Sequence, residues 1–294
     1  MIVEPQNFLE RFEQEAHSPR PDPERLALFI AGAAYPDLDV ARYQYELDEI
    51  ARQVAKRMEN LPAGRARATG FLNAIYGEIG FQGDEAHYYA PRNSCLNSVI
   101  DRRRGLPITL GLVYMALGRR LDLRVEGMGF PGHFMVRYRD GGGVWLLDPF
   151  YGRVVDVSQT SDYLSRLLDQ PLNLPDHIFR PVTSISLILR VLNNLRNAYI
   201  RLDNYGMAAQ VMSYLLVLMP TNASFWQERG LLYYQSEHWE ETVHDLQRYF
   251  FLRGQLANLH QALEDDAAHS QLSHGDRNLL HIYRQADHMM QRLN

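Results

Sequence analysis

The chain has 294 residues, of which 46% are hydrophobic and 11% aromatic, enough to build the cores of two domains. A formal net charge of -5 argues against the broad basic face of nucleic-acid-binding proteins, so we expect no nucleic-acid partner. The single cysteine excludes an intrachain disulfide framework and favours a reducing compartment, the cytoplasm.

The amino terminus has no features of a signal peptide or a membrane anchor. The segment MIVEPQNFLERFEQEA is acidic and contains Pro5, whereas a signal peptide has a cationic start and an apolar core. No uninterrupted apolar run approaches the roughly 20 residues of a membrane-spanning helix. We therefore expect no membrane partner.

A helical pattern covers the first part of the chain. Apolar residues recur at spacings of three and four residues between Asn7 and about Asn60. The segment ARATGFLNAIYGEIGF predicts a further helix that ends near Gly80. The polar and aromatic segment GDEAHYYAPRNS follows, and we expect it to lie on the surface.

A short helix from Cys95, a break at Gly105 and a strongly apolar helix beginning at Pro107 are predicted next. Proline at a first helical position loses no hydrogen bond and presets the backbone angle, so it marks this helix start. The helix that it opens, PITLGLVYMALGRR, has almost no polar face, so we expect it to be buried within its domain.

The sequence period then changes from helical to about two. The segments LRVEGMGF, HFMVRYRD, GVWLLDPF and GRVVDV predict four strands, and the glycines 141–143 predict a hairpin loop between the second and third. One central helix followed by an antiparallel meander is typical of an α+β fold.

The carboxy-terminal part is predicted to be a separate domain of helical repeats. The proline-bounded segment PLNLPDHIFRP predicts a linker, so we place residues 1–180 in one domain and residues 181–294 in the other. Tyr199 and Tyr233 lie 34 positions apart, the tetratricopeptide period. We expect two such units and a final helix to stack and to bind a protein or peptide partner.

The run NSCLNSVIDRRRGLPITLGLVYMALGRRLDLRVEGMGFPGHFMVRY, followed by WLLDPFYGRVV, resembles the SirB1 family. Its members are bacterial proteins with an amino-terminal transglutaminase-like core and carboxy-terminal tetratricopeptide-like helices. The resemblance extends from about residue 40 to about residue 250. It implies a papain-like α+β core behind a helical extension, followed by all-α repeats, and it brings no assigned activity.

The resemblance also implies where a catalytic site would lie. In active members of the wider superfamily, a Cys stands at the amino end of the central helix, a His on the next strand and an Asp on the strand after. By position, His133 in PGHF matches the base and Asp148 in LLDPF matches its orienting carboxylate. The nucleophile position falls at or next to Pro107, which has no nucleophilic group, and the nearby hydroxyl of Thr109 has no predicted direction.

Each of the candidate site residues has two interpretations. Cys95 is either a small buried apolar side chain or a nucleophile activated at the start of its own helix, about a dozen residues before Pro107. His133 either rigidifies the strands or transfers a proton. Asp148 either orients His133 or caps a turn.

Two arginine runs, Arg102 to Arg104 and Arg119 to Arg120, also permit two interpretations. They are either solvated and paired with carboxylates such as Asp101 and Asp122, or they form a site for an anion or an acidic peptide.

The sequence contains no convincing metal or cofactor motif. Three histidines near the carboxy terminus are spaced by seven residues, about 10 Å apart along a helix, which is too far for one metal ion. They are His274, His281 and His288. We expect neither a cofactor nor a metal.

Two functions are compatible with these patterns. The favoured one is a non-catalytic or weakly active transglutaminase-like protein, a pseudoenzyme that binds proteins through its repeats and its His133/Asp148 cleft. The alternative is a cysteine-dependent acyl-transfer or amide-hydrolysing enzyme that uses Cys95, His133 and Asp148. The missing helix-end cysteine favours the first, and whether the chain is an enzyme depends on whether Cys95 reaches His133.

Overall fold

The computed structural model describes residues 7–264 and 273–293, and it divides into two compact units, Met1–Asn194 and Leu195–Asn294. The division falls within helix α8 (Ser184–Ile200), whereas the sequence places the boundary at residue 180, which stays a prediction. Across the described residues, no helix has the length and apolar character needed to cross a membrane.

The helices of the amino-terminal region begin at caps that the sequence supplies. Asn7, Asp22 and Asp39 each accept a hydrogen bond from a backbone N–H in the first turn of the helix that follows. The fourth helix continues into a π-helical turn that ends at Gly80, where φ is 91°, so the predicted stop is confirmed. These elements are α1 (Phe8–Ala16), α2 (Pro23–Ala31), α3 (Val40–Met58), α4 (Arg65–Asn73) and the π-helix Ala74–Ile79.

Two helices carry the motifs that the sequence singles out. The short helix α5 (Leu96–Arg102) follows Cys95, and the central helix α6 (Pro107–Arg120) begins at the predicted proline. Most of the side chains of α6 are buried, as its lack of a polar face predicts. The sequence did not predict a short parallel pair, in which β2 (Arg104–Gly105), between these two helices, pairs with β1 (Gln82–Gly83), which precedes α5.

The predicted antiparallel meander is confirmed as a four-stranded sheet with the order β3, β4, β5, β6. Phe130 pairs with His133, so the two-residue turn between them, with Gly132 at a φ of 66°, fixes where the second strand begins. The strands are β3 (Arg124–Phe130), β4 (His133–Asp140), β5 (Gly143–Asp148) and β6 (Arg153–Asp156).

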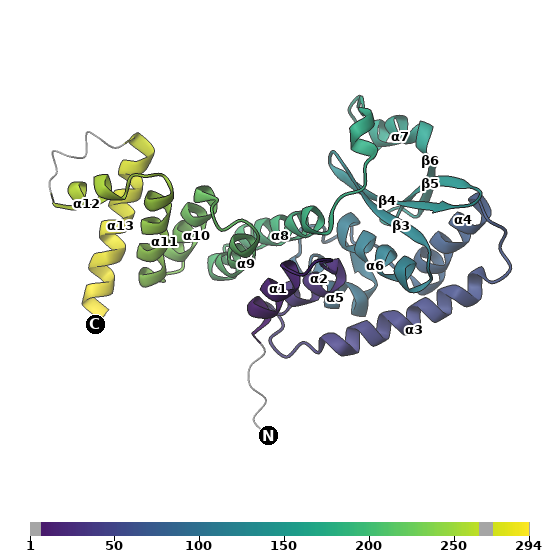
Figure 1. Ribbon diagram of the computed structural model, residues 1–294, viewed down its shortest axis with the longest axis horizontal. Helices are drawn as coiled ribbons and strands as arrows, with labels where there is room; N and C mark the ends of the chain where they lie inside the picture. The colour runs from purple at the N-terminus through teal and green to yellow at the C-terminus, as the bar shows by residue number, and fades with distance from the viewer. Residues whose placement is uncertain (1–6, 265–272, 294) are drawn as a thin grey trace, which may run out of the picture. The chain divides into compact units, whose positions relative to one another are not determined.

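The two faces of this sheet pack against different helices (Figure 1). Phe134 and Val136 of β4 lie against Gly111 in the middle of α6, and Gly111 leaves no room there for a larger side chain. Because side chains alternate along a strand, His133 and Met135 point to the other face. That face belongs to a core cluster that includes Met128, Met135, Leu146 and Leu164 of α7 (Thr160–Leu167).

The segment that the sequence predicts to be a linker is packed rather than free. Leu172, Leu174, Ile178 and Phe179 lie against the core cluster of the sheet, and Asp176–Phe179 forms a 3-10 helix. Apolar residues within the proline-bounded stretch therefore complete the core of the first unit.

The second unit is a series of antiparallel helices, as the 34-residue period predicts. Gly230 lies where a Cβ atom would stand 3.2 Å from Asp245 and 3.3 Å from Leu246, so the glycine lets two helices approach closely. The predicted final helix is confirmed. The helices after α8 are α9 (Tyr205–Leu218), α10 (Ala223–Gln235), α11 (Trp239–Leu252), α12 (Leu256–Glu264) and α13 (His274–Leu293).

Candidate functional site

The side chains of His133 and Asp148 are in direct hydrogen-bond contact at the ends of neighbouring strands. Val136 pairs with Leu147 across β4 and β5. Continuing this register by one residue places Asp148 opposite Met135, so His133 is its diagonal neighbour on the same face of the sheet. The distance from His133 Nε2 to Asp148 Oδ2 is 2.6 Å, and the side chains are 5% and 0% exposed.

The carboxylate of Asp148 is surrounded by hydrogen-bond donors. Its Oδ1 accepts from the backbone N–H groups of Phe150 and Tyr151, at 2.8 and 3.0 Å, so Asp148 caps the turn after β5. Its Oδ2 accepts from His133 and, at 2.7 Å, from the hydroxyl of Tyr163 on α7. Asp148 therefore caps a turn and orients the imidazole at the same time, although the sequence presents these roles as alternatives.

Tyr163 is a site residue that the sequence analysis did not identify. Burial, followed by the charge of Asp148 and the hydrogen bond to it, raises the pKa of Tyr163, so the phenol remains a donor. The residues are 15 positions apart in the chain, and no local pattern connects them. An amphipathic helix directly after the sheet was the available signal, but it does not say which of its side chains turns toward Asp148.

This arrangement leaves one ring nitrogen of His133 for chemistry. An ionised carboxylate only accepts hydrogen bonds, so Nε2 donates to Asp148, and in the neutral imidazole Nδ1 is then the acceptor. Within the part of the chain that the structure describes, no hydrogen bond to Nδ1 is formed. An imidazole held in this way can accept a proton or a hydrogen bond from a group that a ligand brings to Nδ1.

A row of aromatic rings connects His133 with the surface. The ring of Tyr151 stacks on His133 with a centroid distance of 6.0 Å, and Phe150 contacts Tyr151 at 4.8 Å. The ring centroid of Tyr88 lies 5.9 Å from that of Phe150 and 5.2 Å from that of Tyr89. Tyr89 is 62% exposed, so the HYY segment, which the sequence predicts to lie on the surface, begins a path of rings toward the buried imidazole.

Cys95 lies in a different environment from the His133 pair. Its side chain is 1% exposed, and burial raises the pKa of the thiol to about 12. Among the described residues, the sulfur forms no hydrogen bond with His133. The structure therefore brings His133 and Asp148 together and leaves Cys95 outside that hydrogen-bonded group.

The start of the central helix supplies no nucleophile that could act with His133 in place of Cys95. Pro107 is the first residue of α6. The hydroxyl of Thr109 donates to the backbone carbonyl of Asn93 at 2.7 Å and accepts from the backbone N–H of Leu106 at 3.0 Å. Thr109 thus caps its own helix and ties it to the preceding loop.

The arginine runs are internal ion pairs, which agrees with one of their two interpretations. Their partners come from other elements and not from Asp101 or Asp122. Glu24 of α2, which is 1% exposed, forms ion pairs with both Arg119 and Arg120 at 2.6 Å. Further contacts include Arg102 with Asp84 at 3.4 Å, Arg103 with Glu46 at 2.9 Å and Arg104 with the carbonyl of Gly80 at 2.8 Å.

No group of three or more His, Cys, Asp or Glu side chains in the described ranges is arranged to hold a metal ion. The histidines 274, 281 and 288 all belong to α13.

The second unit carries an exposed surface of a different kind, formed by Trp226 of α10 with Arg248 and Phe251 of α11. The guanidinium of Arg248 lies 5.9 Å from the ring centroid of Trp226 and 4.9 Å from that of Phe251. Phe251 is 54% exposed. We call these three residues the repeat surface.

Comparison with known proteins matches both units. Residues 41–193 match the family model described as transglutaminase-like superfamily, and residues 195–273 match the tetratricopeptide repeat. The UPF0162 protein of Xylella fastidiosa strain Temecula1 is 32% identical over 232 residues, covering 77% of this chain and 82% of that protein.

Two further relatives agree with this assignment. The UPF0162 protein of Pseudomonas aeruginosa is 30% identical and covers 77% of this chain and 83% of its own length. Protein SirB1 of Salmonella typhimurium is 25% identical and covers 66% of this chain and 74% of its own length. The resemblance read from the sequence is therefore confirmed, and this chain belongs to the SirB1-like family within the transglutaminase-like superfamily.

Proposed function

We propose that this protein is a non-catalytic member of its superfamily and acts as a protein-interaction module. Its helical repeats would supply one binding surface, and the cleft at His133 and Asp148 would supply the second. The observation that carries the proposal is the lack of a hydrogen bond between the lone thiol, which is buried, and the imidazole. Cys95 forms no hydrogen bond with His133 among the described residues, and without a nucleophile an oriented imidazole orders a ligand but forms no acyl intermediate.

The environment of Cys95 supports the same proposal. Thiolates attack and thiols do not, so a catalytic cysteine needs a lowered pKa. Burial raises the pKa of Cys95 to about 12, and Arg102 opposes this shift only as the smaller effect. At neutral pH the side chain is then a small buried apolar group.

The repeat surface indicates the chemistry of the partner. An arginine held between two aromatic rings, with Phe251 more than half exposed, presents cationic and apolar area together. Aromatic residues and arginine are the side chains most often found as binding hot spots. We therefore infer a peptide segment with acidic and apolar side chains as the partner.

The first experiment measures the rate of iodoacetamide labelling of Cys95 against pH. The expected result is labelling of the folded protein that is much slower than that of free cysteine at pH 7 and is the same in His133→Ala. Unfolding in urea should restore the ordinary rate. Fast labelling below pH 7 that is lost in His133→Ala would instead establish the thiol-enzyme alternative.

The second experiment tests the repeat surface with the full chain. Proteins retained from a bacterial lysate by the tagged wild type are compared with those retained by the double variant Arg248→Ala/Phe251→Ala. Leu202→Ala/Arg277→Ala is the matched control, because it removes an exposed apolar side chain and an exposed arginine of the same unit. We expect a partner that is lost only in the first variant and kept in Cys95→Ala. Equal retention by all variants contradicts the proposal.

A further inference from the structure

A half-buried cation lies at the end of the sheet where His133 begins its strand. Arg190 of α8 donates from Nη2 to the carbonyl of Phe130 at 3.3 Å, and Phe130 is the register partner of His133. The guanidinium carbon lies 5.7 Å from the ring centroid of Phe134, and a Cβ atom at Gly129 would overlap Nη1. Gly129 therefore leaves room for the guanidinium to lie against the edge of β3.

Arg190 has no carboxylate partner among the described residues. Its hydrogen bond to Phe130 is the only one that it forms there, and it forms no ion pair. By contrast, the half-buried Arg229 pairs with Asp245. The other donors of Arg190 are open to solvent, because none of them is a buried atom without a partner. Burial lowers the pKa of Arg190, so its charge would gain from a bound anion.

Tyr88 brings a hydroxyl group and an exposed ring to the same place. Burial, followed by Tyr89 and Tyr151, raises the pKa of Tyr88, and the charge of Arg190 opposes this shift. The phenol is therefore a donor at neutral pH, close enough to the guanidinium for the two charges to interact. The rings of Tyr88 and Tyr89 are 37% and 62% exposed. A cation, a hydroxyl donor and an exposed apolar surface thus meet at the outer end of the row of rings that leads to His133.

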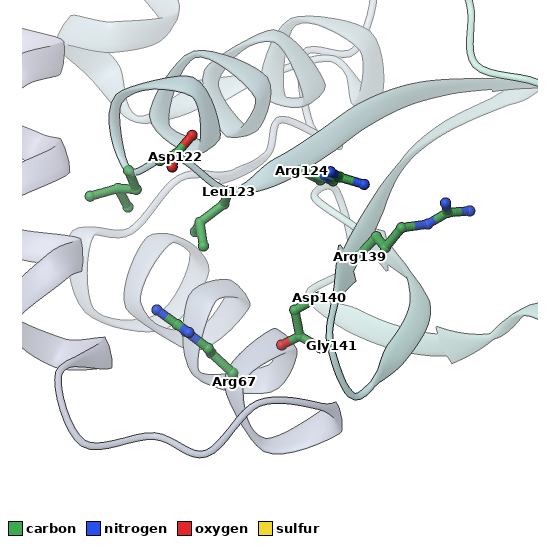
Figure 2. Close-up of a pocket in the computed structure, with 8 residues that line it drawn as sticks. Arg67, Asp122, Leu123, Arg124, Arg139, Asp140 and Gly141 are labelled. Atoms are coloured by element: carbon green, nitrogen blue, oxygen red, sulfur yellow. The ribbon is translucent and has the colours of Figure 1, made fainter.

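The cavity at the other end of these strands does not bring its cations together. Arg67, Arg124 and Arg139 line it. Arg124 and Arg139 are register partners on the face of the sheet opposite α6, and Figure 2 shows their side chains extending away from Arg67. One small anion therefore does not contact all three, whereas the donors of Arg190 and Tyr88 lie near each other.

We propose that Arg190 and Tyr88 bind the carboxylate of an acidic side chain in a partner peptide. The planar guanidinium donates to the carboxylate oxygens, and the hydroxyl of Tyr88 donates a further hydrogen bond. An apolar side chain beside the acidic residue packs on the rings of Tyr88 and Tyr89. The repeat surface suits the same acidic and apolar chemistry, which favours a side-chain carboxylate over a chain terminus. The inference rests on the proposed function, because it names the chemistry of a partner for the His133 cleft, and the carboxylate itself does not contact His133.

An NMR titration of the full, isotope-labelled chain at low ionic strength tests the site, because the Nε–H group of an arginine gives a resonance of its own. The probe is N-acetyl-glutamyl-leucine amide, and the comparisons are N-acetyl-glutaminyl-leucine amide and N-acetyl-leucine. We expect the Arg190 resonance to shift with the glutamyl probe until the site is saturated. In the variants, the backbone amides of Tyr88 and Tyr89 report binding.

Arg190→Gln should weaken binding of the glutamyl probe by at least about tenfold, and Tyr88→Phe by about threefold. Arg190→Lys keeps the charge and should lose less than Arg190→Gln. Arg166→Gln is the control, because it removes an exposed arginine of α7, and it should leave the affinity unchanged.

Binding of the glutamyl probe that depends on Arg190 and Tyr88 supports the proposal. Equal binding of the glutaminyl probe, binding of N-acetyl-leucine alone, no binding of any probe, or an unchanged affinity in Arg190→Gln overturns it. If the amide spectrum shows that Arg190→Gln does not fold, Arg190→Lys and Tyr88→Phe decide. Probe binding that does not depend on Arg190 refutes this inference and leaves the His133 cleft as a binding surface, whereas the lysate comparison tests the proposed function separately.

Discussion

Asp148 is fully buried, and its hydrogen bonds come from two backbone N–H groups, one imidazole and one phenol. A buried carboxylate is tolerated only when such donors replace its water. The two backbone donors fix Oδ1, and the two side-chain donors then determine how His133 is held. The ring orientation of His133 therefore depends on all the groups that donate to Asp148 and not on the His133–Asp148 hydrogen bond alone.

Tyr163→Phe should destabilise the first unit by about 1.5–3 kcal/mol, because it removes a hydrogen bond to a buried charged group. Urea unfolding monitored by circular dichroism measures the change. Tyr151→Phe is the matched control, since it removes a hydroxyl from the ring that stacks on His133 and should change stability by less than about 0.5 kcal/mol. Equal effects of the two substitutions would contradict the assigned role of Tyr163.

The thiol of Cys95 should make stability depend on alkaline pH. Burial raises the pKa of Cys95 in the folded chain from about 9 to about 12, so the unfolded chain releases its proton first. The contribution of the buried, protonated thiol to the free energy of unfolding is complete below pH 9 and is lost as the pH rises toward 12. The expected loss in that window is about 1.4 kcal/mol per pH unit.

Urea unfolding of the wild type and of Cys95→Ala between pH 8 and pH 11 isolates this effect. Tyrosines that titrate in the same range are present in both proteins, so they cancel in the difference. The stability advantage of the wild type should be constant up to about pH 9 and should shrink above it. A constant difference up to pH 11 would show that the thiol ionises with its ordinary pKa.

Among the helices of the second unit, one buried ion pair joins three elements. Arg229 of α10 donates two hydrogen bonds to Asp245 of α11, at 2.7 and 2.8 Å, and a third to Ser213 of α9 at 2.9 Å. The Asp245 side chain is 1% exposed and that of Arg229 is 14% exposed. Repeat helices lack long-range strand pairing, so such contacts fix how successive helices pack.

Asp245→Ala should destabilise the second unit by about 3–5 kcal/mol, because it leaves the Arg229 charge buried without its partner. A Trp145→Phe background restricts tryptophan fluorescence to Trp226 and Trp239, so unfolding of this unit is measured directly. Glu228→Ala is the control. It breaks the pair with Arg196 at 3.2 Å, whose carboxylate is 35% exposed, and should cost less than about 1 kcal/mol.

For the whole molecule, the position of the boundary determines which fragments fold. The backbone N–H of Val182 donates to the carbonyl of Gly127 at 2.9 Å, and Arg190 donates to the carbonyl of Phe130 at 3.3 Å. Both contacts satisfy carbonyls of β3, the first strand in the order of the sheet. Residues beyond 180 therefore contribute to the first unit, although the sequence assigns them to the repeats.

A fragment of residues 1–180 should be less stable than a fragment of residues 1–202 by at least about 2 kcal/mol. The shorter fragment loses both hydrogen bonds to β3 and the packing of Val182 against Gly127 and Gly129. Urea denaturation of the two purified fragments gives the difference. Equal stabilities would support the boundary at residue 180.

The elements that the sequence predicts correctly are those whose pattern lies within a few neighbouring residues. Pro107, the alternation in HFMVRYRD and the break at Gly80 act within a few residues, and the elements that they predict are present in the structure. The parallel pair β1 and β2 was not predicted, because it joins two-residue segments that are too short to show a period. For the packed segment after α7 the sequence predicts a linker, because prolines mark its ends and its four apolar residues follow no regular spacing.

The sequence by itself determined the family, the α+β and repeat architecture and the pairing candidates His133 and Asp148, because caps, periods and motifs depend on neighbouring residues. Only the tertiary structure decided that Tyr163 completes this group, that Cys95 is buried outside it, and which arginines have carboxylate partners. These facts depend on contacts between residues far apart in the chain. Such contacts exist only when the whole core is packed, so no local pattern encodes them.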